Sequence, residues 1–241
     1  MDREKEKYVY SVFESIAPGY DPANRRISLG MQSRWKRKSV ALLAAGLPPD
    51  AAILDLGCGT GDMLLLLHEV LPEASLTGLD FSPAMLAEAG KRCAGIPGLR
   101  FQEGNACELP MEEGTFDGVS MSFALRNTAS YDAAVSEAFR VLRPGGIFLC
   151  VDSFVPRNRL VRPFYRAYFS FLMPLLGGGR KHFREYRWLS RSTEAFLSPD
   201  ALLELFHSRG FRSVRLKRYC FGACCALLGV KGGPAPGCPD E

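Results

Sequence analysis

A glycine-rich segment and a later aspartate could together bind a nucleoside ligand. The segment DLGCGTGD, at 55–62, directly follows a short apolar run. Its residues Gly57, Gly59 and Gly61 let the backbone turn sharply and let a ligand approach closely, because no Cβ intervenes. Asp80 ends the next apolar run, nineteen residues after Gly61, where its carboxylate could accept both hydroxyls of a ribose. The G-x-G-x-G spacing is tighter than that of dinucleotide sites, which argues against a nicotinamide cofactor.

The apolar pattern around these residues predicts alternating strands and helices. We expect strands at 51–56, 74–80, 99–104, 115–123 and 146–154, and helices at 62–71, 82–94, 131–142 and 198–210. Such alternation implies an α/β fold with a parallel, doubly wound sheet that helices cover on both faces. The runs at 211–219 and 221–230 then predict a closing antiparallel β-hairpin.

Length and composition favour one elaborated domain. The chain has 241 residues, of which 47% are hydrophobic and 23% charged, and this excludes a disordered, collagen-like or coiled-coil protein. We expect a single domain over 1–231, with an N-terminal helical lid at 1–50 whose helices flank a polar segment at 17–30. A helical cap is inserted at 155–197, and residues 232–241 form a flexible tail.

The cysteines and the N-terminus predict a cytoplasmic protein. The first residues, MDREKEKYVY, are charged where a secretory signal would be apolar, so the eight cysteines are interpreted as reduced thiols. The longest apolar run, at 169–176, is far shorter than the roughly 18 residues of a membrane span. Cys220, Cys224 and Cys225 lie in an apolar strand pattern without a nearby histidine, so we expect no metal site.

The expected insert carries a marked positive charge. Residues 157–191 hold nine Lys or Arg, eight aromatic residues and one acid, Glu185, whereas the whole chain has a net charge of only +4. This segment could face anionic lipid, an acidic substrate or RNA. The alternative is a solvated basic surface over a few core aromatics.

The glycine loop with Asp80 resembles the class I S-adenosyl-L-methionine-dependent methyltransferases, which have a Rossmann-like fold. The segments 12–35, 78–86, 104–110 (GNACELP) and 122–127 (SFALRN) make the resemblance narrower. In this order they look like the ubiquinone/menaquinone biosynthesis C-methyltransferases, and the resemblance covers about residues 8–231. It implies S-adenosyl-L-methionine as cofactor and the following binding residues: Asp55, Gly57, Gly59, Thr60, Gly61, Asp80, Phe81, Asn105, Ala106 and Ser122.

The same resemblance implies methylation of a ring carbon that a deprotonated quinol hydroxyl makes nucleophilic. Arg126 and Asn127 follow the fourth strand, at the edge of the sheet where such sites lie, and Tyr20 of the lid is their expected catalytic partner. Arginine stays protonated, so Arg126 would orient a water or stabilise a phenolate rather than act as a base. The alternatives are a surface ion pair for Arg126 and a packed lid tyrosine for Tyr20, while Asp21 could simply cap the lid helix.

The leading interpretation is a C-methyltransferase that converts demethylmenaquinol to menaquinol. A C- or O-methyltransferase of another small lipophilic aromatic or polyketide is the first alternative, because Trp188 and Thr193 depart from the family pattern. An RNA methyltransferase has only the basic segment in its favour, and a non-catalytic binding protein is at odds with the intact loop. The expected partners are a prenylated quinol and an anionic membrane surface at the inner membrane face, without nucleic acid; a homodimer stays open.

Overall fold

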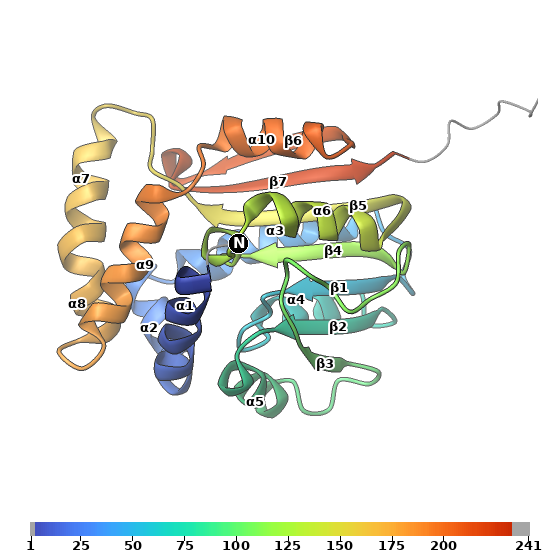
Figure 1. The fold of residues 1–241 in the computed structure, drawn as a ribbon, viewed down its shortest axis with the longest axis horizontal. Coiled ribbons are helices and arrows are strands. Elements are labelled where there is room, and N and C mark those ends of the chain that lie inside the picture. The colour runs from blue at the N-terminus through green and yellow to red at the C-terminus, as the bar shows by residue number, and fades with distance from the viewer. Residues whose placement is uncertain (1–2, 233–241) are drawn as a thin grey trace, which may run out of the picture.

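The computed structural model describes residues 3–232, which fold around one seven-stranded sheet (Figure 1). The strands are β1 (Ala52–Leu56), β2 (Ser75–Asp80), β3 (Arg100–Glu103), β4 (Phe116–Ser122), β5 (Leu142–Ser153), β6 (Phe211–Tyr219) and β7 (Cys224–Lys231). Their order is β3-β2-β1-β4-β5-β7-β6; β1 to β5 are parallel, β7 is antiparallel to β5, and β6 to β7. The predicted doubly wound sheet with a C-terminal antiparallel hairpin is confirmed. Most of the expected tail, residues 233–241, lies outside the described residues.

Helices cover both faces of the sheet, as parallel strands require. α3 (Met31–Ala44), α4 (Asp62–Val70) and α5 (Pro83–Arg92) lie on one face, and α6 (Tyr131–Val141) and α10 (Pro199–Ser208) on the other (Figure 1). Within β1, Leu54 and Leu56 pack toward α6 and α10, whereas Ile53 packs toward α3 and α4. The strand is therefore buried on both sides, which explains its continuous apolar sequence.

A third group of helices packs together beyond the carboxyl edge of the parallel strands (Figure 1). It consists of α1 (Arg3–Ile16), α2 (Tyr20–Ile27), α7 (Val161–Ala167), α8 (Met173–Gly178) and α9 (Phe183–Ala195). Val12 and Ile16 of α1 share an apolar cluster with Met173 of α8 and Leu189 of α9. The N-terminal segment and the insert thus form one helical layer over the edge where ligand sites of such sheets lie.

The segment 17–30, expected as a polar link between helices, is itself largely helical. A short 3-10 turn leads into α2, which has Asp21 in its first turn and Arg25 and Arg26 in its last. These charges complement the helix dipole, so a polar sequence can still form a helix. Gly30, with a φ of +74°, separates α2 from α3.

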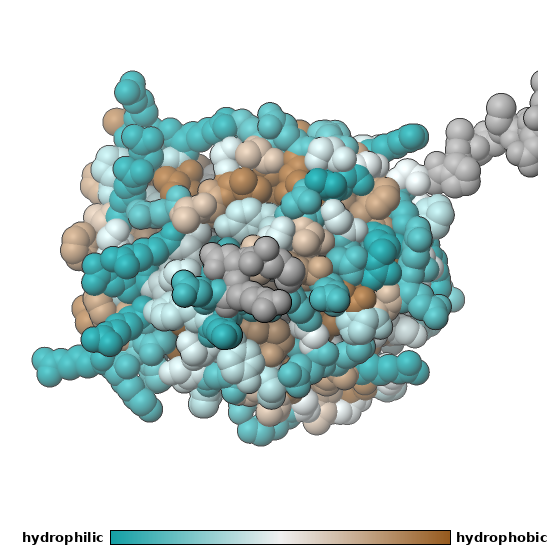
Figure 2. Space-filling view, in the orientation of Figure 1, coloured by the Kyte–Doolittle hydropathy of each residue, from teal (hydrophilic) through white to brown (hydrophobic). Residues whose placement is uncertain are grey.

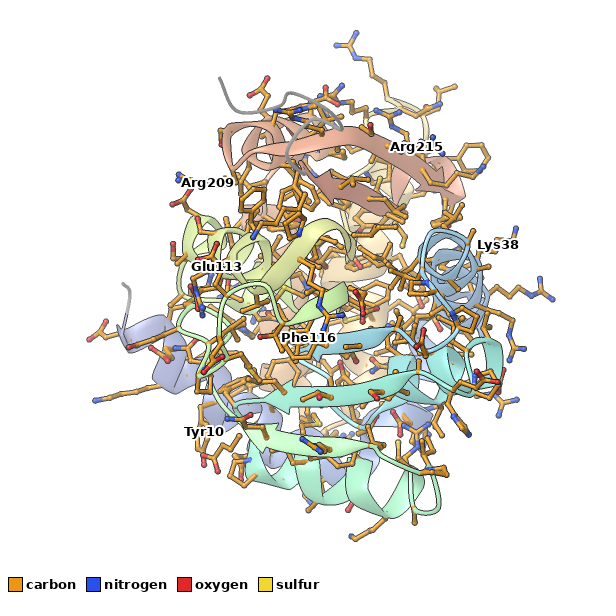
Figure 3. The ribbon with its side chains drawn as sticks, turned by 90° about the vertical axis from the view of Figure 1, so that its right-hand side faces the viewer. Tyr10, Lys38, Glu113, Phe116, Arg209 and Arg215 are labelled. Atoms are coloured by element: carbon orange, nitrogen blue, oxygen red, sulfur yellow. The ribbon has the colours of Figure 1, made fainter. Side chains whose placement is uncertain are left out.

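β5 begins at Leu142 rather than at 146, because the residues Arg143 to Gly146 extend the strand directly from α6. Leu142 pairs with Phe116 of β4, and the register shifts between Phe116 and Gly118. Phe116 points into the core (Figure 3). The irregularity accommodates Pro144, Gly145 and Gly146 without ending the strand.

Candidate active site

The loop between β1 and α4 depends on backbone angles that favour glycine. Gly57, Gly59 and Gly61 have φ values of +65°, +54° and +85°. A Cβ added to Gly57 would lie 2.5 Å from the Cβ of Ala124, whereas no atom of the described residues lies within 4 Å of one added to Gly59. Gly59 therefore leaves its backbone open to a ligand, as the sequence predicts.

Asp80 closes β2 with its carboxylate turned toward this loop. The backbone N–H of Gly59 donates to Oδ2 at 2.8 Å, and that of Ser82 donates to Oδ1 at 3.0 Å. The residue is 4% exposed, and burial raises its pKa to about 6 even though these bonds favour the ionised form. The backbone bonds fix the carboxylate and leave it lone pairs with which to accept ligand hydroxyls.

A cavity of about 720 Å³, here called the first cavity, opens beside the loop and Asp80. Its wall includes most of the predicted cofactor-binding residues, namely Gly57, Gly59, Asp80, Phe81, Asn105, Ala106 and Ser122. Tyr20 and Asn127, predicted as catalytic, also line it. The hydroxyl of Ser122 is buried without a hydrogen-bond partner among the described residues, so a ligand could satisfy it.

Three of the predicted cofactor-binding residues lie outside this wall. Asp55 accepts a hydrogen bond from Oγ of Ser120 at 2.6 Å, and burial raises its pKa to about 7. Thr60 turns toward α2 instead of the cavity. Gly61 faces α5, where an added Cβ would lie 2.6 Å from Sγ of Cys93. These three residues thus face β4, α2 and α5.

Carboxylates that the sequence did not single out hold α1 over the first cavity. Glu6 lines the cavity and accepts a hydrogen bond from Nδ2 of Asn105 at 2.7 Å. Glu14 accepts from Oγ of Ser82 at 2.6 Å and from the backbone N–H of Ala84 at 3.0 Å. Since Glu6 and Asn105 are 99 positions apart, no local pattern could have paired them.

Asp21, which could have been a simple helix cap, instead ties α2 to the glycine loop. Its Oδ1 accepts a hydrogen bond from Oγ1 of Thr60 at 2.7 Å, and its Oδ2 pairs with Nη1 of Arg92 at 2.9 Å. The same guanidinium donates through Nη2 to Asp62 at 2.6 Å. The N-terminal helices and the glycine loop are therefore joined by one charged network.

A second cavity, of about 1390 Å³, lies between α2, α3 and the insert. Its wall is largely apolar and aromatic and includes Ile27, Leu29, Trp35, Phe164, Tyr165, Tyr168, Phe169 and Met173. Tyr20 and Phe123 line both cavities, so the two adjoin at these residues. An apolar, ring-shaped ligand fits the second cavity, and a polar ligand with hydroxyls fits the first.

Arg126 and Asn127 stand at this boundary, on different sides of it. Arg126 lines the second cavity and Asn127 the first. Nη1 of Arg126 donates to the carbonyl of Phe123 at 2.9 Å and pairs with Oδ1 of Asp152. The alternative of a surface ion pair is wrong, because Arg126 is 8% exposed and Asp152 is fully buried. Nε of Arg126 and Oδ1 of Asn127 have no partner among the described residues.

Tyr20 reaches this boundary from the start of α2. Burial is the main cause that raises the pKa of its hydroxyl, against the charge of Arg126, which lowers it. The hydroxyl therefore stays protonated near neutral pH and can donate or accept a hydrogen bond. Tyr20, predicted from the sequence as the partner of Arg126 and Asn127, lines one cavity with each of them.

Two kinds of comparison place the chain among known proteins. A model of the ubiE/COQ5 methyltransferase family matches residues 1–231. The demethylmenaquinone methyltransferase of Thermus thermophilus is 42% identical to this chain over 221 residues, which cover 90% of this chain and 99% of the relative. The demethylmenaquinone methyltransferase of Symbiobacterium thermophilum is 37% identical over 238 residues, which cover 95% and 94%.

Solved structures agree on the fold. A SAM-dependent methyltransferase from Thermotoga maritima has a TM-score of 0.61 to this chain at 22% identity, covering 92% of this chain and 99% of its own. At that identity the likeness concerns the fold alone. It confirms the class I methyltransferase arrangement that the resemblance implied.

Proposed function

We propose, since the chain belongs to the ubiE/COQ5 methyltransferase family, that it methylates a ring carbon of demethylmenaquinol to give menaquinol. The observation that carries this proposal is the pair of adjoining cavities, one beside the glycine loop and Asp80 and one apolar, which share Tyr20 and Phe123. The named relatives favour this substrate over another lipophilic aromatic, a polyketide or RNA. The methyl donor is S-adenosyl-L-methionine.

The residues of the first cavity fit this cofactor. When bound, S-adenosyl-L-methionine supplies an electrophilic sulfonium methyl group. In this proposal Asp80 accepts the ribose hydroxyls and Asn105 and Ala106 frame the adenine, which is supported by the position of all three in the wall of the first cavity. The open backbone at Gly59 suits the close approach of the methionine portion.

The second cavity holds the quinol ring beside the boundary residues. Arg126 keeps its charge and can stabilise the negative charge that develops on a ring oxygen as the quinol loses its proton. Asp152 and the carbonyl of Phe123 fix the guanidinium by Nη1, which leaves Nε for the substrate. The aromatic walls exclude water and so strengthen this electrostatic interaction.

A transfer assay with methyl-labelled S-adenosyl-L-methionine tests the proposal. Purified protein is incubated anaerobically with short-tailed demethylmenaquinol, with its oxidised quinone, with a demethoxy-type benzoquinol or with bulk RNA. We expect label on the naphthoquinol ring carbon and none on the quinone, because the quinone has no hydroxyl to ionise. Label on RNA alone, or on none of the four, would contradict the proposal.

The surface around the second cavity suits contact with an anionic membrane, which we include in the proposal because the substrate is membrane-derived. Among residues 3–232 no helix has both the length and the apolar character to cross a bilayer. Yet Leu29, Phe164 and Phe171 are 75%, 79% and 76% exposed, and Arg162 and Arg166 are exposed on α7. Figure 2 shows apolar atoms among polar ones at this end of the molecule. Such side chains suit reversible binding at the inner membrane face.

Sedimentation with vesicles tests this contact. We expect binding to phosphatidylglycerol vesicles at low salt and release as salt rises, since each basic residue contributes about 1 kcal/mol at an anionic surface. Replacing Arg162 and Arg166 with glutamate should abolish binding. The matched control replaces Lys38 and Arg215 with glutamate. Both side chains point to solvent elsewhere on the molecule (Figure 3). Failure of the wild type to bind, or equal losses in both variants, would refute a docking role for the insert.

A further inference from the structure

The second cavity contains a polar group that the proposed reaction has not yet used, the hydroxyl of Tyr165. This residue belongs to α7, lines the cavity and is only 9% exposed. Its hydroxyl oxygen is buried and has no hydrogen-bond partner among the described residues. A buried hydroxyl without a partner is costly, so such a group at a cavity points to a ligand that completes it.

The surroundings of Tyr165 turn it inward and fix the direction of its ring. The neighbouring Phe164 is 79% exposed, so α7 turns Tyr165 inward. Its ring stacks on Phe169 with 4.1 Å between centroids and 25° between planes, which fixes its direction. Burial raises the pKa of this hydroxyl, and the positive charge of Arg126, which lines the same cavity, acts on the hydroxyl in the opposite direction and lowers its pKa.

The residues that line the second cavity include three with a buried donor that has no partner among the described residues: Nε of Arg126 and the hydroxyls of Tyr165 and Ser28. Burial raises the pKa of Tyr165, so its proton is retained and can be donated. The carboxylate of Asp152 is already engaged by Arg126 and by the backbone N–H of Ser153 at 2.7 Å. A ligand with an apolar ring and acceptor oxygens matches these donors.

We propose that Tyr165 is a specificity-determining residue that donates a hydrogen bond to a ring oxygen of the substrate. The inference rests on the proposed function, since it takes the ligand of this cavity to be a quinol. A ring without an oxygen at that position would leave the hydroxyl of Tyr165 buried and unpaired, and the site would reject it. The enzyme thereby distinguishes substrates by the positions of the oxygens on the ring, independently of the prenyl tail.

Ligand-binding measurements on Tyr165→Phe test this role, with Tyr168→Phe as the matched control. Tyr168 lines the same cavity, but its hydroxyl already donates to the carbonyl of Ile27. The probes are 2-prenyl-1,4-naphthalenediol, its two mono-hydroxy analogues and 2-prenylnaphthalene, titrated anaerobically by calorimetry with S-adenosylhomocysteine present. We expect Tyr165→Phe to weaken the diol about tenfold, the scale of one hydrogen bond and its unpaired partner.

The two mono-hydroxy analogues locate the effect. The analogue that lacks the oxygen bound by Tyr165 should bind to Tyr165→Phe at least as tightly as to the wild type, because phenylalanine leaves no hydroxyl unpaired. Tyr168→Phe should keep the wild-type pattern for every probe. An unchanged affinity for the diol, or an equal loss for the diol and 2-prenylnaphthalene, would overturn the proposal. Unchanged affinity for S-adenosylhomocysteine verifies that the variant is folded. Absence of methyl transfer by the wild type would instead refute the proposed function, while these binding ratios still report on Tyr165.

Discussion

Replacing Asp152 with asparagine should destabilise the protein strongly, because it leaves the charge of Arg126 uncompensated inside the fold. Asp152 is fully buried and Arg126 is 8% exposed, so water can do little to solvate the remaining charge. Asparagine fills nearly the same volume, and the packing around it should therefore persist. Removal of one partner from a buried ion pair costs about 3–5 kcal/mol.

This cost converts into a measurable fall in melting temperature. For a chain of this size, 1 kcal/mol corresponds to about 2–4 °C, so Asp152→Asn should melt roughly 6–20 °C below the wild type. Domains are typically stable by about 5–15 kcal/mol, and most of the variant should still be folded at 25 °C. Circular dichroism during heating, together with urea unfolding at 25 °C, measures both quantities.

Two further variants separate this cause from simple loss of packing. Arg126→Met combined with Asp152→Leu removes both charges, which should recover most of the stability but none of the methyl transfer. Asp132→Asn breaks an exposed ion pair with Arg209 (Figure 3) and should cost about 1 kcal/mol or less. The reasoning is refuted if Asp152→Asn melts as the wild type does, or if the double variant is no more stable than the single one.

Four other variants probe residues in and around the candidate site. Asp80→Ala should weaken S-adenosyl-L-methionine by about 1.5–3 kcal/mol, and calorimetric affinities equal to the wild type would contradict the ribose assignment. Since the pKa of Asp80 is about 6, wild-type affinity should fall as the pH drops below 6, whereas Asp80→Asn should show no such step. Arg126→Ala should lower turnover far more than cofactor affinity, and wild-type turnover at saturating quinol would leave Arg126 a structural role only. Burial holds the pKa of Asp55 at about 7 in the folded state, above its unfolded value of about 3.9. Its contribution to the free energy of unfolding therefore falls as the pH rises through that window. Urea unfolding measures the free energy of unfolding of the wild type and of Asp55→Asn at each pH. The difference between the two should drop by up to about 4 kcal/mol between pH 4 and 7, and a constant difference would contradict this.

The gathering of the glycine loop and Asp80 at one cavity could be predicted from the sequence because its determinants are local. The backbone of Gly57 and Gly59 needs positive φ, and Asp80 ends an apolar strand beside them. Both features show in short stretches of sequence, and the parallel order of β1 and β2 follows from the alternation of strands and helices. The fold class was predictable for the same reason.

The partners of Arg126 could not be predicted, because they depend on how β4 and β5 pair. Arg126 and Asp152 are 26 positions apart, and they meet because Ser122 pairs with Val151 at the ends of the two strands. From the sequence, Asp152 was only an acid at the end of a strand. Tyr165 was equally hidden, since one basic, aromatic segment gives no indication of which rings turn inward.

The helical content of 17–30 was also missed, for a different physical reason. Its polar composition suggested a link between helices. Few apolar residues anchor α2, and one of them, Ala23, is buried in the cluster formed by α1, α8 and α9. The helix is stabilised instead by bonds that span the chain, such as that of Asp21 with Thr60. Tertiary contacts of this kind override the local pattern.

The boundary between the two cavities explains why the protein tolerates strain at Phe123. Its φ is +58°, a left-handed value that disfavours a residue with a side chain. In this conformation its N–H donates to the carbonyl of Val151 at 2.7 Å, while its own carbonyl accepts from Nη1 of Arg126 at 2.9 Å. Its ring meanwhile lines both cavities. Phe123 thus fixes the guanidinium of Arg126 and forms part of the wall between the two cavities. In the proposed reaction the methyl donor and the quinol meet across this wall, so the strain lies where the reaction needs a rigid boundary.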